Sequence, residues 1–126
     1  MDVEWRGTRP LILLAEDEAI IAVELQESLS DSGFSVAGPF ATCAEAEAWL
    51  KTGTPDAAIL DHALKDGPCD DLAADLSRRG VPTLIFTGHD APREMLAELH
   101  AATWITKPVA FPELLSVLRR QIRAQA

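Results

Sequence analysis

The 126-residue chain is short of several residue types, and each shortage excludes a class of protein. Its two cysteines, Cys43 and Cys69, have no metal-ligand spacing, so a disulfide scaffold and a cysteine zinc site are excluded and two reduced thiols are expected. No apolar run approaches the roughly 20 residues that span a bilayer, and the first residues have no signal-peptide pattern. We therefore expect a cytoplasmic location and no membrane partner.

Positive charge is also scarce. The chain has 11 lysines and arginines against 20 aspartates and glutamates, which gives a formal net charge of −9. A surface this acidic repels the phosphates of nucleic acids and of anionic lipids, so we expect no nucleic acid as a partner. The hydrophobic share of 48% is enough to bury one core. We expect an N-terminal arm at residues 1–9 and one domain at residues 10–126.

What the sequence does contain is a regular alternation of short apolar runs and amphipathic segments. Uninterrupted runs such as Leu11–Ala15 are typical of strands that are covered on both faces of a parallel sheet. Such runs predict strands at residues 11–15, 34–40, 57–60, 82–86 and 103–106. The segments between them predict helices at about residues 21–33, 44–51, 71–79, 92–100 and 111–122. Five strands alternating with five helices predict an α/β domain with an open, doubly wound parallel sheet.

Polar residues follow four of the predicted strands. They are Glu16 and Asp17, Asp61, Thr87 and Gly88, and Lys107 with Pro108. Each of these alone is more often a turn former, a helix cap or a solvated surface charge. The carboxyl ends of parallel strands meet at one edge of the sheet, where ligands bind in such folds. The sequence therefore predicts that three carboxylates, a hydroxyl and an ammonium converge there.

This set of groups has a chemical logic. Three carboxylates a few ångströms apart repel one another, so stability alone does not gather them. One divalent cation together with Lys107 offsets their charge, and oxygen ligands of this kind suit Mg²⁺. An aspartate beside Mg²⁺ can attack phosphorus and form an acyl phosphate. The Thr87 hydroxyl, the Lys107 ammonium and the Gly88 backbone N–H can stabilise the charge of the transferring group.

These residues, in this order, resemble the response-regulator receiver domains of bacterial two-component signalling. The resemblance covers Leu11 to about Ile122, and it rests on the segments Leu13–Glu18, Ala58–Asp61, Phe86–Gly88 and Lys107–Pro108. It implies a flavodoxin-like fold with strand order 2-1-3-4-5. The segments Val36–Pro39 and Phe86–Gly88 are similar to an alphaproteobacterial subgroup that includes stand-alone, chemotaxis-regulator-like receivers and receivers fused to histidine kinases.

The resemblance also implies a role for each site residue. Asp61 is expected to be the phosphoacceptor, with Glu16, Asp17, Asp61 and the backbone carbonyl of Ala63 as ligands of Mg²⁺. Thr87 is expected to be the switch hydroxyl, and Lys107 the positive contact of the phosphate. The Lys107–Pro108 bond is expected to be cis.

The chain departs from the family pattern at four places. The loop after Asp61 is short and lacks its common proline, and the stretch from Thr87 to Lys107 is also short. The usual switch aromatic, Tyr or Phe, is replaced by Trp104, which is either a moving side chain or an aromatic at the edge of the core. Ala63 and His89 occupy positions that tune phosphate loss in the family. These departures affect the expected output rather than the expected phosphorylation.

The leading hypothesis is a phosphoacceptor module rather than an enzyme, with self-catalysed phosphoryl transfer and hydrolysis only. Its expected partner is a sensor histidine kinase or a histidine phosphotransfer protein, and its output is protein contacts or a phosphate sink. In the family the partner docks on a surface that here comprises Ala19, Ile20, Pro108, Val109 and Ala110.

Three alternatives remain at the level of sequence. They are a pseudo-receiver that binds without phosphorylation, a receiver excised from a hybrid histidine kinase, and a phosphohydrolase of the haloacid-dehalogenase type. The complete set of acidic residues and Lys107 argues against the pseudo-receiver. The phosphohydrolase needs a second aspartate two residues after the nucleophile, and Ala63 stands there.

Overall fold

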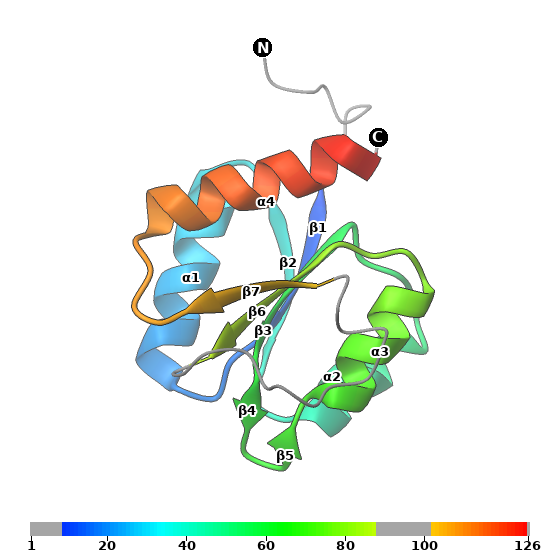
Figure 1. The fold of residues 1–126 in the computed structure, drawn as a ribbon. Coiled ribbons are helices and arrows are strands. Elements are labelled where there is room, and N and C mark those ends of the chain that lie inside the picture. The colour runs from blue at the N-terminus through cyan, green and yellow to red at the C-terminus, as the bar shows by residue number, and fades with distance from the viewer. Residues whose placement is uncertain (1–8, 88–101, 126) are drawn as a thin grey trace.

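The computed structural model describes residues 9–87 and 102–125, and in these residues one parallel sheet forms the centre of the molecule (Figure 1). Its strands are β1 (Leu11–Ala15), β2 (Ser35–Phe40), β3 (Ala57–Asp61), β6 (Thr83–Thr87) and β7 (Thr103–Thr106). They lie in the order β2-β1-β3-β6-β7, which confirms the predicted order 2-1-3-4-5. The order reverses between β1 and β3, so a crevice is expected at the carboxyl ends of these two strands.

Helices cover both faces of the sheet, as a doubly wound fold requires (Figure 1). The described residues contain four: α1 (Ala19–Asp31), α2 (Cys43–Leu50), α3 (Asp70–Arg78) and α4 (Phe111–Gln125). The fifth predicted helix, at residues 92–100, lies outside the described residues, as does most of the N-terminal arm expected at residues 1–9. Among the helices described, none has both the length and the apolar character that a membrane span needs.

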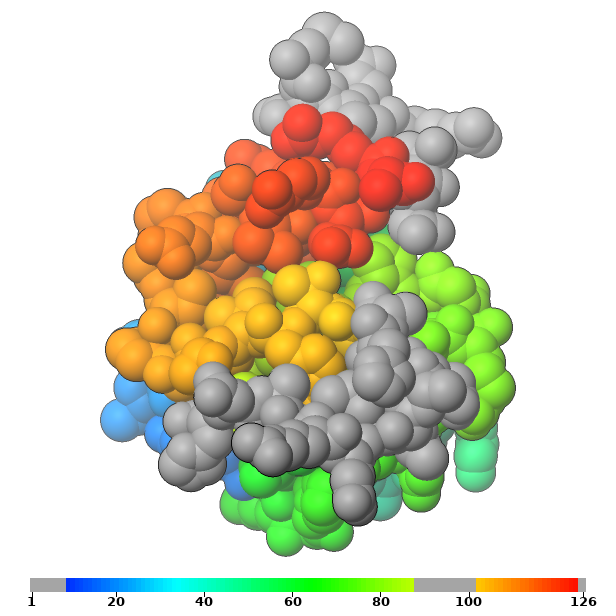
Figure 2. All heavy atoms as spheres, in the orientation of Figure 1, coloured from blue at the N-terminus to red at the C-terminus, as the bar shows by residue number. Residues whose placement is uncertain are grey.

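Successive residues of the strands point to opposite faces, and both faces are buried, which explains the uninterrupted apolar runs. One core lies beneath α2 and α3, and its strand residues include Leu13, Ala15, Ala58, Leu60 and Ile85. The other lies beneath α1 and α4, and its strand residues include Ile12, Leu14, Ile59, Leu84 and Phe86. Among the described strands, β7 pairs with β6 alone, and Figure 2 shows it at the surface beside α4. The two-sided core holds the strand ends in fixed positions.

Strand β2 bends next to β1, and Gly38 permits the bend. Gly38 has φ +109°, and a Cβ there would lie 2.6 Å from the backbone oxygen of Leu14. The register between the two strands shifts at this point, so that Ala15 pairs with Phe40. The N–H of Glu16 then donates to the Phe40 carbonyl at 2.9 Å. The second strand, which carries no chemical group of its own, therefore positions the backbone of Glu16.

The segment after Asp61 differs from its prediction as a plain polar loop. It forms a small antiparallel hairpin of β4 (Ala63–Leu64) and β5 (Gly67–Pro68), which pair residue for residue. Leu64 is buried in the core beneath α2 and α3, and this contact holds the hairpin against the domain. The short loop is therefore an ordered element packed beside the site.

Candidate functional site

The three predicted carboxylates do meet at the carboxyl edge of the sheet. Glu16 and Asp17 follow β1, and Asp61 is the last residue of the neighbouring strand β3. Each offers an oxygen atom, and these three atoms lie within 4.8 Å of one another. The residues come together because two parallel strands in register end at the same height.

Lys107 supplies the positive charge of the cluster. Its ammonium donates to Oδ2 of Asp61 at 3.1 Å and lies 3.6 Å from Oε1 of Glu16. The backbone N–H of Lys107 donates to the carbonyl of Thr87 at 2.8 Å, which ties the end of β7 to the end of β6. The Lys107–Pro108 bond is cis, as predicted. One lysine therefore contacts carboxylates from two strands.

Glu16 is the most deeply buried member of the cluster, with 3% of its surface exposed. Its Oε2 accepts a hydrogen bond from the N–H of Glu18 at 3.2 Å. Its Oε1 is buried and has no hydrogen-bond partner among the described residues, apart from the longer ion-pair contact with Lys107. Burial, reinforced by the charge of Asp61, raises the pKa of Glu16 from 4.5 to about 7.

A buried carboxylate oxygen without a hydrogen bond, at the centre of an acidic group, fits a divalent cation. The donors are all oxygen atoms, which is the ligand set that Mg²⁺ prefers. Burial by itself lowers the pKa of Lys107, but its hydrogen bond to Asp61 and the charges of Glu16, Asp61 and Glu18 outweigh burial and raise it. Lys107 therefore stays charged at neutral pH and offsets one of the three negative charges.

Thr87 and Gly88 were predicted to lie on the next strand end. Thr87 ends β6 and is 8% exposed, one residue beyond Phe86, which pairs with Asp61. The hydroxyl-bearing residue is therefore beside β3, the strand that ends in Asp61, as predicted. Gly88 and His89 lie outside the described residues.

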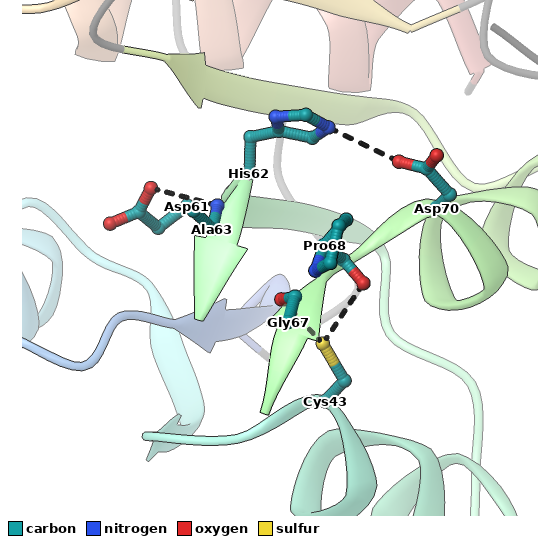
Figure 3. A network of polar contacts seen from close by, with 7 residues as sticks. All are labelled: Cys43, Asp61, His62, Ala63, Gly67, Pro68 and Asp70. Atoms are coloured by element: carbon teal, nitrogen blue, oxygen red, sulfur yellow. Dashed lines mark hydrogen bonds and ion pairs between the residues drawn. The ribbon is translucent and has the colours of Figure 1, made fainter. Parts of the chain in front are cut away.

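Ala63 lies on the exposed side of the cluster, at the start of β4. Its N–H donates a long hydrogen bond of 3.4 Å to Oδ1 of Asp61 (Figure 3). The backbone of Ala63 is thus next to the predicted metal ligands. Its methyl group leaves no acid or base at this position.

His62 and Asp70 belong to the surroundings of the site, and the sequence analysis did not include them. Nε2 of His62 lies 3.1 Å from Oδ1 of Asp70, in the first turn of α3 (Figure 3). The His62 ring also packs edge-on against Trp104, with ring centroids 5.2 Å apart. Trp104 is half-buried and packs against the core beneath α2 and α3, which fits an aromatic at the edge of the core. The only sequence signal for His62 was its position directly after Asp61.

The predicted docking residues lie at one end of the domain. Ala19 and Ile20 are exposed at the start of α1, and Ile20 has 75% of its surface exposed. Pro108 and Ala110 are exposed between β7 and α4, whereas Val109 is half-buried. Ile20 is therefore a surface residue and not part of the core.

Between α1 and α4 lies a cavity of about 350 Å³ that the sequence did not reveal, with a lining of mainly apolar residues including Leu25, Val109 and Phe111.

Comparison with known proteins points in the same direction. A family model described as the response regulator receiver domain matches residues 12–119. Two curated relatives are the transcriptional regulatory protein PdtaR of Mycobacterium tuberculosis, 26% identical over 110 residues, and the response regulator MprA of Mycobacterium avium, 30% identical over 116 residues. The matches cover 85% and 89% of this chain but 54% and 50% of the relatives, so the chain spans about half their length.

Solved structures share the fold. A CheY-like receiver domain protein from Methanospirillum hungatei has a TM-score of 0.80 at 24% identity, covering 94% of this chain and 97% of that one. A receiver protein from Sinorhizobium medicae has a TM-score of 0.78 at 25% identity, covering 94% and 98%. The regulator TrrA of Thermotoga maritima, solved in complex with Mg(2+)-BeF, has a TM-score of 0.75 at 22% identity, covering 89% and 98%.

Proposed function

The chain belongs to the response regulator receiver domain family, and on that premise we propose that it accepts a phosphoryl group on Asp61 from a histidine kinase or a histidine phosphotransfer protein. One observation carries the proposal. Oxygens of Glu16, Asp17 and Asp61 lie within 4.8 Å of one another, and the Lys107 ammonium lies 3.1 Å from Asp61. Three carboxylates beside one ammonium leave a surplus of negative charge, which a divalent cation offsets. A cation in this position can also hold a phosphoryl group next to Asp61.

Glu16, Asp17 and Asp61, with the backbone carbonyl of Ala63, would hold Mg²⁺. When bound, the ion would offset negative charge on the phosphoryl oxygens and so favour formation of the acyl phosphate. The unpartnered Oε1 of Glu16 and the oxygen-only donor set support this assignment. The relative TrrA was solved with Mg(2+)-BeF, which gives the assignment further support from a protein of the same fold.

The transfer itself uses the side chains of this chain. An Asp61 carboxylate oxygen attacks the phosphorus of a phosphohistidine, the O–P bond forms, and the P–N bond breaks with its electron pair left on the imidazole. The Lys107 ammonium, now paired with Asp61, contacts the developing negative charge. The Thr87 hydroxyl and the Gly88 N–H are the proposed donors to the remaining phosphoryl oxygens. Water later hydrolyses the acyl phosphate.

The same residues distinguish this proposal from two alternatives. A pseudo-receiver that binds no metal and no phosphoryl group does not need a buried glutamate whose Oε1 accepts no hydrogen bond, or a lysine beside it. Both groups are present here, as Glu16 and Lys107. A phosphohydrolase needs an acid or base two residues after the nucleophile, and the side chain of Ala63 is a methyl group. We therefore propose a cytoplasmic signalling module without enzymatic turnover, whether it works alone or within a longer protein such as a hybrid kinase.

The proposed partner surface comprises Ala19, Ile20, Pro108, Val109 and Ala110. The 75% exposure of Ile20 supports it, because a large apolar side chain at the surface beside a phosphorylation site suits a transient interface. The proposed output is contact with a further protein or competition for phosphate.

The proposal is tested by adding beryllofluoride, which mimics an acyl phosphate, and following tryptophan fluorescence with and without Mg²⁺. A Mg²⁺-dependent change is expected in the wild type and not in Asp61→Asn. Acetyl phosphate followed by mass spectrometry gives an independent measurement, with an adduct expected on Asp61. Absence of both the fluorescence change and the adduct would contradict phosphotransfer and leave a module that works by binding alone.

A further inference from the structure

The hairpin that follows Asp61 is attached to helix α2 by a side chain that the proposed chemistry does not use. Oδ1 of Asp66 accepts a hydrogen bond from the N–H of Cys43 at 2.7 Å, and Oδ2 accepts one from the N–H of Ala44 at 3.0 Å. Cys43 and Ala44 are the first two residues of α2, whose N–H groups have no partner within the helix. The hydrogen bonds from Cys43 and then Ala44 lower the pKa of Asp66, so it is charged at neutral pH.

The two hydrogen bonds of Asp66 are called the Asp66 clamp below, and weaker contacts accompany them. The Cys43 thiol lies 3.7 Å from the Gly67 carbonyl oxygen and 3.6 Å from that of Pro68 (Figure 3). The N–H of Lys65 donates to the carbonyl of Ala41 at 3.4 Å. These contacts are long, and charge-assisted hydrogen bonds such as those of Asp66 are about twice as strong as neutral ones. Asp66 is therefore the main polar anchor of the hairpin on α2.

The opposite side of the same hairpin faces the phosphorylation site. Ala63 begins β4, and its N–H donates to Oδ1 of Asp61 through a hydrogen bond that is long, at 3.4 Å, and therefore weak. Two strands of two residues each have little stability of their own. The position of the Ala63 backbone beside Asp61 is therefore set by what holds the hairpin. Buried Leu64 and the Asp66 clamp hold its body, and 2.9 Å backbone hydrogen bonds of His62 with Phe86 and Cys69 hold its base.

We propose that Asp66 is a positioning residue for the phosphorylation site: by clamping the hairpin β4–β5 onto the N-terminus of α2, it holds the Ala63 backbone in place and raises the affinity for Mg²⁺. This inference rests on the proposed function, because it assigns Asp66 an effect on the metal site of that function. Residues that orient a metal ligand without touching the metal have effects of this kind, and Asp66 would act on Ala63 through the backbone of the hairpin.

A matched control separates positioning from helix capping. Helix α2 has a second cap in Thr42, whose Oγ1 accepts a hydrogen bond from the N–H of Glu45 at 3.1 Å. Thr42 caps α2 from within its own segment and has no contact with the hairpin among those described. Thr42→Ala and Asp66→Ala both weaken the start of α2, but only Asp66→Ala releases the hairpin.

The test measures the Mg²⁺ concentration that gives half-maximal phosphorylation by acetyl phosphate, with the adduct quantified by mass spectrometry. Asp66→Ala is expected to raise this concentration roughly tenfold, with most of the maximal rate recovered at saturating Mg²⁺. Thr42→Ala is expected to lower Tm about as much as Asp66→Ala does, but to keep the wild-type Mg²⁺ dependence. Asp66→Asn, which keeps one acceptor oxygen, is expected to lie between wild type and Asp66→Ala, and it serves if Asp66→Ala does not fold.

Two outcomes overturn the inference while the proposed function stands. The first is a phosphorylated wild type with an unchanged Mg²⁺ dependence in both Asp66 variants. The second is an equal shift in Thr42→Ala and Asp66→Ala, which assigns the effect to the stability of α2. A wild type that takes no phosphoryl group at any Mg²⁺ concentration overturns the proposed function and this inference together, and the wild-type sample alone reveals it.

Discussion

The imidazole of His62 packs edge-on against the indole of Trp104, with ring centroids 5.2 Å apart and an interplanar angle of 67°. His62 directly follows Asp61, and Trp104 lies on the edge strand β7, two strands away from β3 in the sheet. This aromatic pair connects the end of β3 to the edge of the sheet. The second contact of His62, with Asp70, extends the connection to α3.

A double-mutant cycle measures the strength of this contact. His62→Ala, Trp104→Leu and the double variant are compared with wild type by urea unfolding. Edge-to-face aromatic pairs contribute about 0.5–1.5 kcal/mol beyond their burial, so a coupling of that size between His62 and Trp104 is expected. His62→Ala is also expected to shift the tryptophan emission to longer wavelength. That shift should be absent when Trp104 is already replaced. Additive stabilities would show that the rings do not interact.

Removal of Lys107 is expected to affect metal binding and phosphorylation in opposite directions. Lys107→Met takes away the ammonium 3.1 Å from Asp61 and 3.6 Å from Glu16. Mg²⁺ then meets a more negative cluster, and an interaction on the order of 1 kcal/mol tightens its binding about fivefold. Phosphorylation by acetyl phosphate is expected to slow at least roughly tenfold, because the developing phosphoryl charge loses its cation.

Isothermal titration with Mg²⁺ and adduct quantification check both parts of the Lys107 prediction. Lys51→Met, which removes an exposed lysine at the C-terminal end of α2, is the control and is expected to change neither value appreciably. Equal loss of metal binding and phosphorylation in Lys107→Met would indicate a damaged fold instead.

The metal-free protein is expected to lose stability as pH rises from about 4.5 to about 7. The pKa of Glu16 is about 7 in the folded state against 4.5 as its ordinary value, so the folded state holds this proton more tightly than the unfolded state. The contribution is fully present below pH 4.5 and is lost as pH rises through 7. Glu16 alone is thereby expected to lower the free energy of unfolding by on the order of 3 kcal/mol between these limits.

Urea unfolding of the wild type and of Glu16→Gln over this pH range tests that dependence. The amide keeps the shape of the side chain without its charge, so the variant is expected to show a flatter profile and to be the more stable protein at pH 8. Addition of Mg²⁺ at pH 8 is expected to stabilise the wild type more than the variant, because the ion binds the ionised carboxylates of the folded state. Parallel pH profiles would remove Glu16 as the cause.

Gly38 is expected to tolerate no side chain. Its φ of +109° is unfavourable for alanine, and the added Cβ would lie 2.6 Å from the Leu14 oxygen and 2.9 Å from the Phe40 nitrogen. Gly38→Ala is therefore expected to cost about 2–4 kcal/mol of unfolding free energy. Gly53→Ala is the matched control, because no heavy atom lies within 4 Å of its added Cβ, and its change is expected to stay within about 0.5 kcal/mol. Thermal unfolding of the two variants gives the comparison.

The strands and the meeting of Glu16, Asp17, Asp61 and Lys107 were predictable from local patterns in the chain, whereas the strand order came from the resemblance to receiver domains. The central strands β1, β3 and β6 are short, mainly apolar runs, and each functional side chain lies at the end of a strand or directly after it. Parallel strands bring these positions to one edge of the sheet. No contact between distant side chains had to be known in order to place the site.

Other features depend on contacts between residues far apart in the chain. Asp66 caps a helix 23 residues earlier, and His62 packs against Trp104 from the other side of β6. The hairpin β4–β5 forms because Leu64 is buried and α2 lies beside it, whereas a six-residue polar segment has no such preference of its own. The exposure of Ile20 likewise depends on which face of α1 the sheet covers.

Local periodicity therefore determined the sheet and the identity of the groups at its carboxyl edge, since each strand is specified by its own few residues. The tertiary packing alone decided how those groups are held. The burial of the Glu16 carboxylate depends on segments that pack around it, and the clamp of Asp66 on α2 exists only where segments from different parts of the chain come within hydrogen-bonding distance. Such contacts follow from the way the helices pack on the sheet, which the pattern of a single segment does not encode.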